Sequence, residues 1–200
     1  MAKKKTQSPR QPTRKPGIER YNRIVQAAEA LILEGSALED LSLDAVAQRA
    51  GVPRVSLYYF FDSVGMLLDA LYQRAVQKMV AELPPPPATD DWRELLGLYA
   101  DSVRDFYLKN RVEMVLGLKP VSHDSFNQAG RTFGTALYEL LLSRGAVPKS
   151  LKVARACEIV AELPELVWRK SLIEQGSITP AYHKEAKRLV IAYMASVLEV

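Results

Sequence analysis

Four consecutive prolines at positions 84–87, within "LPPPPATDD", set the strongest limit on the fold of this 200-residue chain. Proline has no backbone N–H and clashes with the preceding turn, so a helix cannot continue through this stretch. The run is the clearest break in the sequence. We therefore interpret residues 83–91 as the connection between a small N-terminal domain and a larger C-terminal domain.

On both sides of this break, apolar residues recur at the three- and four-residue intervals of a helix face. The first such stretch covers residues 21–32 and ends at Gly35, a residue suited to a left-handed C-cap. Further helices are predicted over 43–50, 53–61, 63–79, 91–109, 110–118, 124–145, 149–175 and 179–199. We expect Pro164 to kink or split the helix at 149–175. Without alternating or hairpin patterns, the prediction is an all-α fold.

Composition and cysteine content are those of an ordinary reducing-compartment protein that can bury a core. The chain is 48% hydrophobic and has a single cysteine, Cys157, which excludes an internal disulfide framework. The basic N-terminus is not followed by an apolar run, and "LVIAYMASVL" is far shorter than the ~20 residues of a spanning helix. A cytoplasmic location without membrane contact is therefore expected.

The net charge of +4 is unevenly distributed along the chain. Residues 1–20 contribute +6, residues 21–75 contribute −3, and the remaining residues contribute +1. The N-terminal excess lies in a segment rich in Pro, Gln, Ser and Thr, which predicts a disordered basic arm over residues 1–17. Such arms often lie along nucleic acid, although a solubilising tail has the same composition. The basic residues of the arm are Lys3, Lys4, Lys5, Arg10, Arg14 and Lys15.

The two short helices predicted at 43–50 and 53–61, joined by Gly51, match the plan of a helix-turn-helix. Val46, Val52 and Leu57 are apolar where these helices must pack, and Ala47 is small where they approach closely. The spacing favours DNA binding, but glycine-linked helical hairpins are common in other proteins.

The sequence "LSLDAVAQRAGVPRVSLYYFFDSVGMLLDAL", after a helix ending in Glu-Gly, closely resembles the DNA-binding domain of TetR/AcrR-family transcriptional regulators. The resemblance covers residues 18–75 and is densest in "VAQRAGV", "SLYYFF" and "LL". It implies a DNA-binding domain at 18–75 and a helical ligand-binding and dimerisation domain at 76–200. The implied function is a homodimeric repressor that a small, apolar effector releases from a palindromic operator.

The resemblance also implies roles for individual residues. The DNA-binding set is Ser42, Arg54, Val55, Ser56, Tyr58 and Tyr59. Ser42 matches a capping residue that suits a phosphate, and Arg54, Val55 and Ser56 match the start of the recognition helix. Arg54 is a candidate for a bidentate contact to guanine, or else for a phosphate ion pair. Leu57 and Phe61 match core positions between the DNA-facing tyrosines.

Three positions depart from the family pattern. Pro53 replaces a serine that would cap the recognition helix, and Phe60 replaces a frequent histidine, where it can pack against the first helix. Val64 replaces a lysine that commonly anchors phosphate. Because residues 21–75 are also net negative, we hypothesise that the basic arm supplies the missing attraction to DNA.

No catalytic, metal-binding or cofactor-binding pattern is found, and no enzyme activity is expected. His123 and His183 are sixty residues apart and are interpreted as surface or capping residues. Cys157 lies among apolar residues, which favours a buried structural thiol, with a redox sensor as the alternative.

The C-terminal half offers aromatic residues for an effector site and an apolar face for dimerisation. Tyr99, Phe106, Met114, Phe133 and Trp168 are candidates to contact an effector, although aromatic residues at helical spacing are often simple core. The proposed dimerisation face comprises Tyr182, Leu189, Val190, Tyr193, Met194 and Val197, together with the helix at 149–175. Two other functions stay open: an effector-independent DNA-binding protein that only dimerises through this half, and a small-molecule carrier or enzyme.

Overall fold

The computed structural model describes residues 12–35, 37–119 and 123–199. Within these ranges the chain is helical and has no strand, which confirms the all-α prediction. The chain divides into two compact units, with the boundary between Arg74 and Ala75. Each unit has its own packing and is described by itself.

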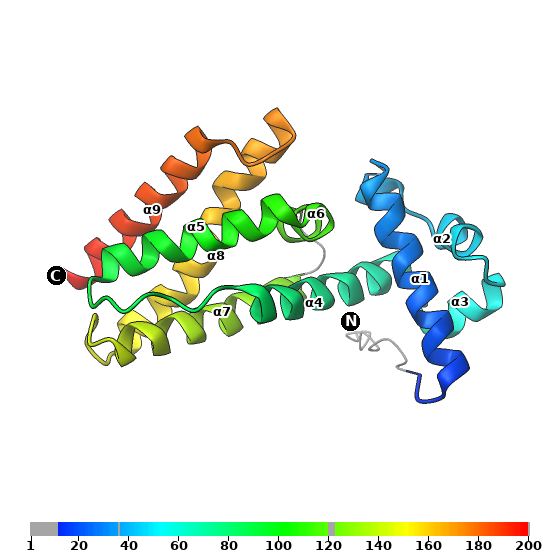
Figure 1. Ribbon diagram of the computed structural model, residues 1–200, viewed down its shortest axis with the longest axis horizontal. Helices are drawn as coiled ribbons and strands as arrows, with labels where there is room; N and C mark the ends of the chain where they lie inside the picture. The colour runs from blue at the N-terminus through cyan, green and yellow to red at the C-terminus, as the bar shows by residue number, and fades with distance from the viewer. Residues whose placement is uncertain (1–11, 36, 120–122, 200) are drawn as a thin grey trace, which may run out of the picture. The chain divides into compact units, whose positions relative to one another are not determined.

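The first unit contains α1 (Lys15–Leu33), a 3₁₀ turn η1 (Leu38–Asp40), α2 (Leu43–Ala50), α3 (Arg54–Phe60) and the start of α4 (Val64–Glu82). Helix α1 packs against both α2 and α3 (Figure 1). The helix begins six residues before Tyr21, the first apolar residue of its pattern. Pro16 fits this first turn, because the backbone nitrogens there have no partner within the helix. The last three residues of the predicted disordered arm, 15–17, are therefore helical. The turn η1 was not predicted.

Local capping groups define the helix-turn-helix. The Ser42 hydroxyl accepts a hydrogen bond from the N–H of Ala45 at 3.1 Å and starts α2. Gly51 ends α2 in the left-handed conformation, with φ of 61°, and turns the chain toward α3. Pro53 precedes α3 and supplies no side-chain cap, as its position in the sequence predicts. Residues 41–61 therefore form two short helices joined by a tight turn.

The four adjacent aromatic residues of "YYFF" divide between the interior and the surface of the first unit. Phe61 and Leu57 are fully buried, and Phe60 is 4% exposed. The Tyr21 ring of α1 contacts Phe60 edge-on at 5.8 Å between centroids and lies 5.4 Å from Phe61. Packing of Phe60 against the first helix is thus confirmed. Burial of this kind contributes roughly 1.5–3 kcal/mol for each large side chain.

The proline run does not connect the two units. Helix α4 starts after Ser63, whose hydroxyl accepts from the N–H of Met66 at 3.2 Å, and continues without a break to Glu82. The boundary between the units falls inside this helix, whereas residues 84–87 lie within the second unit. The sequence-based interpretation of residues 83–91 as an interdomain connection was therefore wrong. The prolines end α4 and lead the chain into the next helix.

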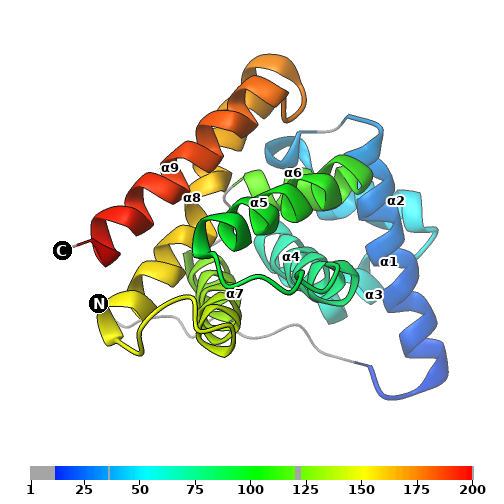
Figure 2. The same cartoon turned by 60° about the vertical axis from the view of Figure 1, so that its left-hand side comes forward.

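The second unit continues with α5 (Trp92–Lys109), α6 (Arg111–Leu118), α7 (His123–Ser143), α8 (Leu151–Gln175) and α9 (Pro180–Leu198). Every predicted boundary of these helices lies within two residues of the observed one. Helix α8 packs on α6, α7 and α9, and α5 packs on α6 and α9. Figures 1 and 2 both show α9 beside α8 (Figure 1, Figure 2). Pro164 lies inside a continuous α8, so it does not split the helix.

Helices α7 and α8 approach closely at two glycines of α7. A Cβ atom at Gly134 would collide with the backbone of Glu158, and one at Gly130 would collide with the Glu162 side chain. At Gly134 the obstacle is backbone, so a side chain there would force the two helices apart, whereas the flexible Glu162 carboxylate near Gly130 can move aside.

Two apolar clusters make up the interior of the second unit. One includes Leu96, Leu141, Cys157, Val190 and Met194, and the other surrounds Trp168. None of the helices in the described part of the chain is long and apolar enough to cross a membrane.

Candidate functional site

Helix α3 presents a continuous exposed face. Val55 is 82% exposed, Tyr58 is 49% exposed and Tyr59 is 58% exposed, while Leu57 between them is buried. Arg54 at the start of the helix is also exposed, and Ser56 is partly buried. An exposed valine and two exposed tyrosines are costly on a surface that has no partner, since apolar area remains in water. The face is therefore suited to contact another molecule.

The Arg54 guanidinium forms an ion pair with the carboxylate of Asp44, which joins the first turn of α2 to the first turn of α3. Both side chains remain substantially exposed, at 66% and 47%, so the pair contributes little to stability. An approaching anion would have to share the guanidinium with Asp44 or displace this carboxylate.

Two other arginines of the first unit are also paired. Arg49 binds Glu34, and Arg74 lies 3.8 Å from Glu29. Val64, at the position where the resemblance predicts lysine, is a partly buried apolar residue. Ser42 is exposed, and its hydroxyl accepts from Ala45, which leaves the O–H available to an outside acceptor. Among the described residues, Arg54, Arg49 and Arg74 of this unit thus all have a carboxylate partner.

The predicted basic arm is described only in part. Lys3, Lys4, Lys5 and Arg10 lie outside the described residues. Arg14 precedes α1 in an extended conformation, and Lys15 is the first residue of that helix; both are exposed. A contact between the arm and DNA stays a prediction.

The five effector candidates lie together in one apolar cluster of the second unit. Phe106, Met114 and Trp168 are buried in it, and Tyr99 and Phe133 pack against it while remaining partly accessible. These residues come from α5, α6, α7 and α8, so helices distant in the sequence converge here. This packing fits both alternatives: the five residues can be ordinary core residues, or they can line an effector site.

The same cluster contains polar groups that the sequence analysis missed. Tyr107 donates its hydroxyl hydrogen to Glu165 at 2.7 Å. Burial raises the pKa of Glu165 to about 7, although the Tyr107 hydrogen bond and Arg169 act in the opposite direction. Burial, reinforced by the Glu165 charge, also raises the pKa of Tyr99. The available sequence signal was a glutamate three residues before a tryptophan, and hence on nearly the same face of α8.

The indole N–H of Trp168 is also buried, and no residue in the described part of the chain accepts its hydrogen. An unpaired buried donor is costly, because water no longer satisfies it. This donor adds a second polar group to the cluster, beside Glu165.

Two residues of the predicted dimerisation face are unavailable to a second subunit. Val190 is 1% exposed and Met194 is fully buried, both in the cluster that includes Leu96 and Leu141. Tyr193 and Val197 are partly buried against the same cluster. The placement of Val190 and Met194 on a dimer face was therefore wrong, because these two residues pack inside their own subunit. Leu189 remains exposed, and the Tyr182 hydroxyl donates to Glu174.

A different apolar stripe is exposed on α8. Leu151, Ile159, Leu166 and Ile173 are 85%, 41%, 61% and 73% exposed, respectively. Their intervals of seven and eight residues place them on one side of the helix. Of the predicted dimerisation face, α8 and Leu189 remain exposed, and Tyr182, Tyr193 and Val197 remain partly accessible.

Two further interpretations are decided by burial. His183 is only 5% exposed, so its interpretation as a surface or capping residue was wrong; it lies on the buried stripe of α9 with Ala186 and Val190. Cys157 is fully buried, and burial raises the pKa of its thiol to about 12. A thiol that keeps its proton is a poor nucleophile, which favours the structural role.

Two charged residues of α5 and α6 have partners of opposite charge: Arg104 pairs with Asp105, and Glu113 pairs with Lys78 at 2.6 Å.

Comparison with curated proteins finds helix-turn-helix regulators. An HTH-type transcriptional repressor of Mycobacterium tuberculosis is 34% identical over 76 residues, and this match spans 38% of this chain but only 29% of the relative. The HTH-type transcriptional regulator EthR of the same organism is 27% identical over 153 residues, covering 71% of this chain and 70% of EthR. A comparison with protein-family models finds no match.

Comparison with solved structures extends the likeness to nearly the whole chain. A TetR-family regulator from Streptomyces coelicolor superposes with a TM-score of 0.67 at 23% identity, over 90% of this chain and 99% of the other. The multidrug binding protein EbrR, solved with imidazole, gives a TM-score of 0.61 at 22% identity over 91% of each chain. At these identities the likeness concerns the fold. The resemblance stated from the sequence is thereby confirmed at that level.

We expect Glu165 to make folding stability depend on pH. Its pKa is raised in the folded chain, so the folded state favours the protonated carboxyl, and stability falls as the pH rises from about 4.5 to 7. Replacing Glu165 with Gln should remove up to about 3 kcal/mol of this pH dependence. Urea unfolding of both proteins at pH 5 and pH 8 measures the difference. An equal pH dependence in the two proteins would contradict the assignment.

Proposed function

We propose that this chain, which has the fold of the TetR-family transcriptional regulators, is a sequence-specific DNA-binding regulator that represses transcription as a homodimer. The observation that carries the proposal is the exposed face of α3, with Val55, Tyr58 and Tyr59 in water beside an arginine at the helix start. The second helix of a helix-turn-helix enters the major groove with its N-terminal residues near the base edges. Arg54, Val55 and Ser56 hold those positions.

Each group on this face has a partner on duplex DNA. A guanidinium can donate two hydrogen bonds to guanine, and the Val55 methyl groups can pack on a thymine methyl. The Tyr58 and Tyr59 hydroxyls and the Ser42 O–H, at the start of α2, are suited to phosphate oxygens. In this proposal the Arg54 guanidinium exchanges the Asp44 carboxylate for acceptors on the DNA.

The proposed effector site is the cluster around Trp168. Tyr99, Phe106, Met114 and Phe133 would surround an apolar molecule, and Glu165 and the Trp168 N–H would recognise its polar groups. A multidrug binding protein among the structural neighbours supports a site of this kind. An effector with a hydrogen-bond donor or a positive charge fits Glu165 best.

The proposed dimer forms through the exposed apolar stripe of α8 and the adjacent part of α9 that includes Leu189. Two copies of these helices would form a four-helix bundle. Recognition of a specific DNA sequence also requires a dimer, because one short α3 contacts few base pairs. Two α3 helices contact two half-sites about 34 Å apart. Operator DNA lies in the bacterial cytoplasm, which is therefore the proposed location.

Signal transfer would use α4. This helix is continuous from Val64 to Glu82, so it belongs to both units. An effector that binds one arrangement of the dimer more tightly shifts the population toward it, by no more than the difference in affinity. If that arrangement misplaces the two α3 helices, the operator is released.

The competing functions are separated by one binding experiment. Mobility shifts with the DNA upstream of the gene, with and without candidate ligands, distinguish a responsive regulator from an effector-independent one. A folded dimer that gives no specific shift at low salt would exclude both and favour a carrier or an enzyme.

We expect replacement of Arg54 with Ala to weaken operator binding by about 10- to 100-fold, the usual cost of a lost bidentate base contact. Replacement of exposed Lys152 on α8 with Ala removes the same charge from a residue outside the proposed DNA-binding set and should leave binding unchanged. Fluorescence anisotropy with labelled operator measures both. Unchanged binding by the Arg54 variant, with helical content preserved, would contradict the role of this residue.

Deletion of residues 2–11 tests the basic arm without removing any residue of α1. The deletion removes four basic residues, and each neutralised phosphate contributes about 0.9 to the slope of log K against log salt, so the slope should fall by up to about 3.6. Operator affinity measured at several salt concentrations between about 50 and about 200 mM gives this slope. The same slope with and without the arm would show that the arm does not touch DNA.

The α8 stripe is tested by replacing Leu166 and Ile173 with Asp. A buried unpaired carboxylate at a subunit interface is strongly unfavourable, so we expect a folded monomer. Light scattering after gel filtration gives the mass, and circular dichroism reports the fold. Replacing Leu108, an exposed leucine on α5, with Asp is the control that should remain dimeric. A dimer that survives the double substitution would place the interface elsewhere.

A further inference from the structure

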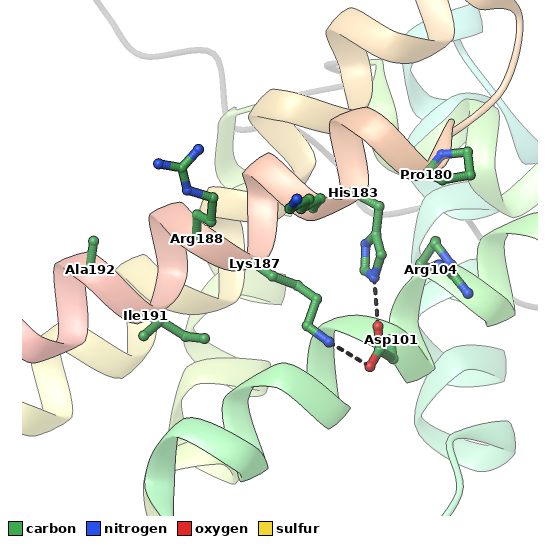
Figure 3. A pocket seen from close by; sticks show the side chains of 9 residues that line it. Asp101, Arg104, Pro180, His183, Lys187, Arg188, Ile191 and Ala192 are labelled. Carbon is green, nitrogen blue, oxygen red and sulfur yellow. Dashed lines mark hydrogen bonds and ion pairs between the residues drawn. The ribbon is translucent and has the colours of Figure 1, made fainter.

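A groove of about 550 Å³ lies between α5 and α9 in the second unit. Figure 3 shows side chains of both helices pointing into it (Figure 3). Its lining combines charged groups with an apolar surface formed by Pro180, Ile191 and Ala192. The residues of the Trp168 cluster do not line it, so the groove is distinct from the proposed effector site.

One carboxylate organises the groove. Asp101 on α5 accepts a hydrogen bond from His183 Nε2 at 2.6 Å and one from Lys187 Nζ at 2.7 Å, both on α9 (Figure 3). Burial alone would raise the pKa of Asp101, but the hydrogen bonds and charges of Lys187 and His183 hold it below its usual range. Asp101 therefore favours its ionised form and already accepts one hydrogen bond on each of its two oxygens.

The remaining charges in the lining are positive. Arg104, Lys184, Lys187 and Arg188 contribute four cationic groups against the single carboxylate of Asp101. Outside the lining, Asp105 pairs with Arg104, and Glu185 pairs with Arg188 at 3.1 Å. Taken together, the four cations and the three carboxylates Asp101, Asp105 and Glu185 leave a surplus of one positive charge, which still favours an anion over a cation.

The Lys187 side chain is held in place by packing. Its Cε atom would lie 3.3 Å from a Cβ at Gly97, so the glycine leaves space for the lysine stem over α5. With its stem fixed and its ammonium bound to Asp101, Lys187 loses little additional freedom when a second anion binds. Its ammonium retains further donors for that anion.

We propose that this groove binds a small organic carboxylate carrying a short apolar chain. The carboxylate lies among Lys187, Lys184 and Arg104, and the chain covers Ile191 and Ala192. A free cation would meet a net positive lining and a carboxylate that already has two donors. The inference goes beyond the proposed regulator, because binding is a property of the free protein and is measured without DNA.

The groove also adjoins the Trp168 cluster through a buried ring contact. The His183 ring lies 5.7 Å from Trp168 at an angle of 30°, and its Nδ1 atom is buried with no partner in the described residues. Trp168 in turn contacts Tyr107 edge-on at 6.2 Å. A ligand that disturbs the Asp101–His183 hydrogen bond therefore changes the surroundings of Trp168, which provides a spectroscopic signal.

The first test compares hexanoate, acetate and hexanamide by isothermal titration calorimetry on the full chain at neutral pH. We expect hexanoate to bind, acetate to bind at least tenfold more weakly because it lacks the apolar chain, and hexanamide to show no binding because it lacks the charge. Hexanoate should also shift the tryptophan emission of a Trp92→Phe variant, in which Trp168 is the remaining tryptophan. Equal binding of hexanoate and hexanamide would overturn the proposal.

The second test assigns the binding to the groove. Lys184→Ala and Arg104→Ala should each weaken hexanoate binding about tenfold, as expected for a lost charge-assisted hydrogen bond. Lys152→Ala, which removes an exposed cation of α8, is the matched control and should have no effect. An equal loss in the control, or no loss in the groove variants, would overturn the proposal.

The Asp101→Asn variant separates an anion site from a cation site. Without the carboxylate, the repulsion of a bound anion disappears while the Lys187 stem stays packed over Gly97, so hexanoate should bind more tightly. Thermal unfolding checks that the variant retains its fold. Weaker hexanoate binding together with binding of hexylammonium by the unaltered chain would identify a cation site and overturn the proposal.

Discussion

The packing of α8 on three neighbouring helices is the interaction on which the second unit depends. One side of this helix buries Cys157, Val160 and Trp168, while glycines in α7 allow a close approach on another. Its exposed side carries the apolar stripe that we assign to the dimer. A single helix thus supplies residues of the interior clusters, the polar group Glu165 and the proposed subunit contact. A change on one face is therefore expected to affect the others, because a close-packed interior does not deform freely.

Polar groups in apolar surroundings are the main indication of function in this unit. Glu165 and the Trp168 N–H are each more costly in this cluster than apolar residues of similar size would be, and the Asp101–His183–Lys187 network joins α5 to α9 along the groove. Two neighbouring helices do not require such groups in order to pack. Their placement beside a cluster of aromatic residues and along a groove is the basis for assigning two separate ligand sites.

The first unit was predicted from sequence in considerable detail. The Ser42 cap, the turn at Gly51 and the division of "YYFF" into exposed tyrosines and packing phenylalanines all follow from local rules, and the structure confirms them. Local signals suffice here because the helices are short and each is delimited by a cap or a glycine. The Arg54–Asp44 pair was not predicted, since two residues ten positions apart meet only when α2 and α3 fold across the turn.

The sequence by itself determined the all-α class, the helix-turn-helix and most helix boundaries, because capping and apolar periodicity act over a few residues. Only the tertiary structure decided which face of each long helix is buried. It turned Val190 and Met194 inward, brought Asp101 to His183 across 82 residues, and placed the prolines inside the second unit. An amphipathic helix shows which side avoids water, but not whether its own chain or a second molecule covers that side. That choice is made when the helices pack.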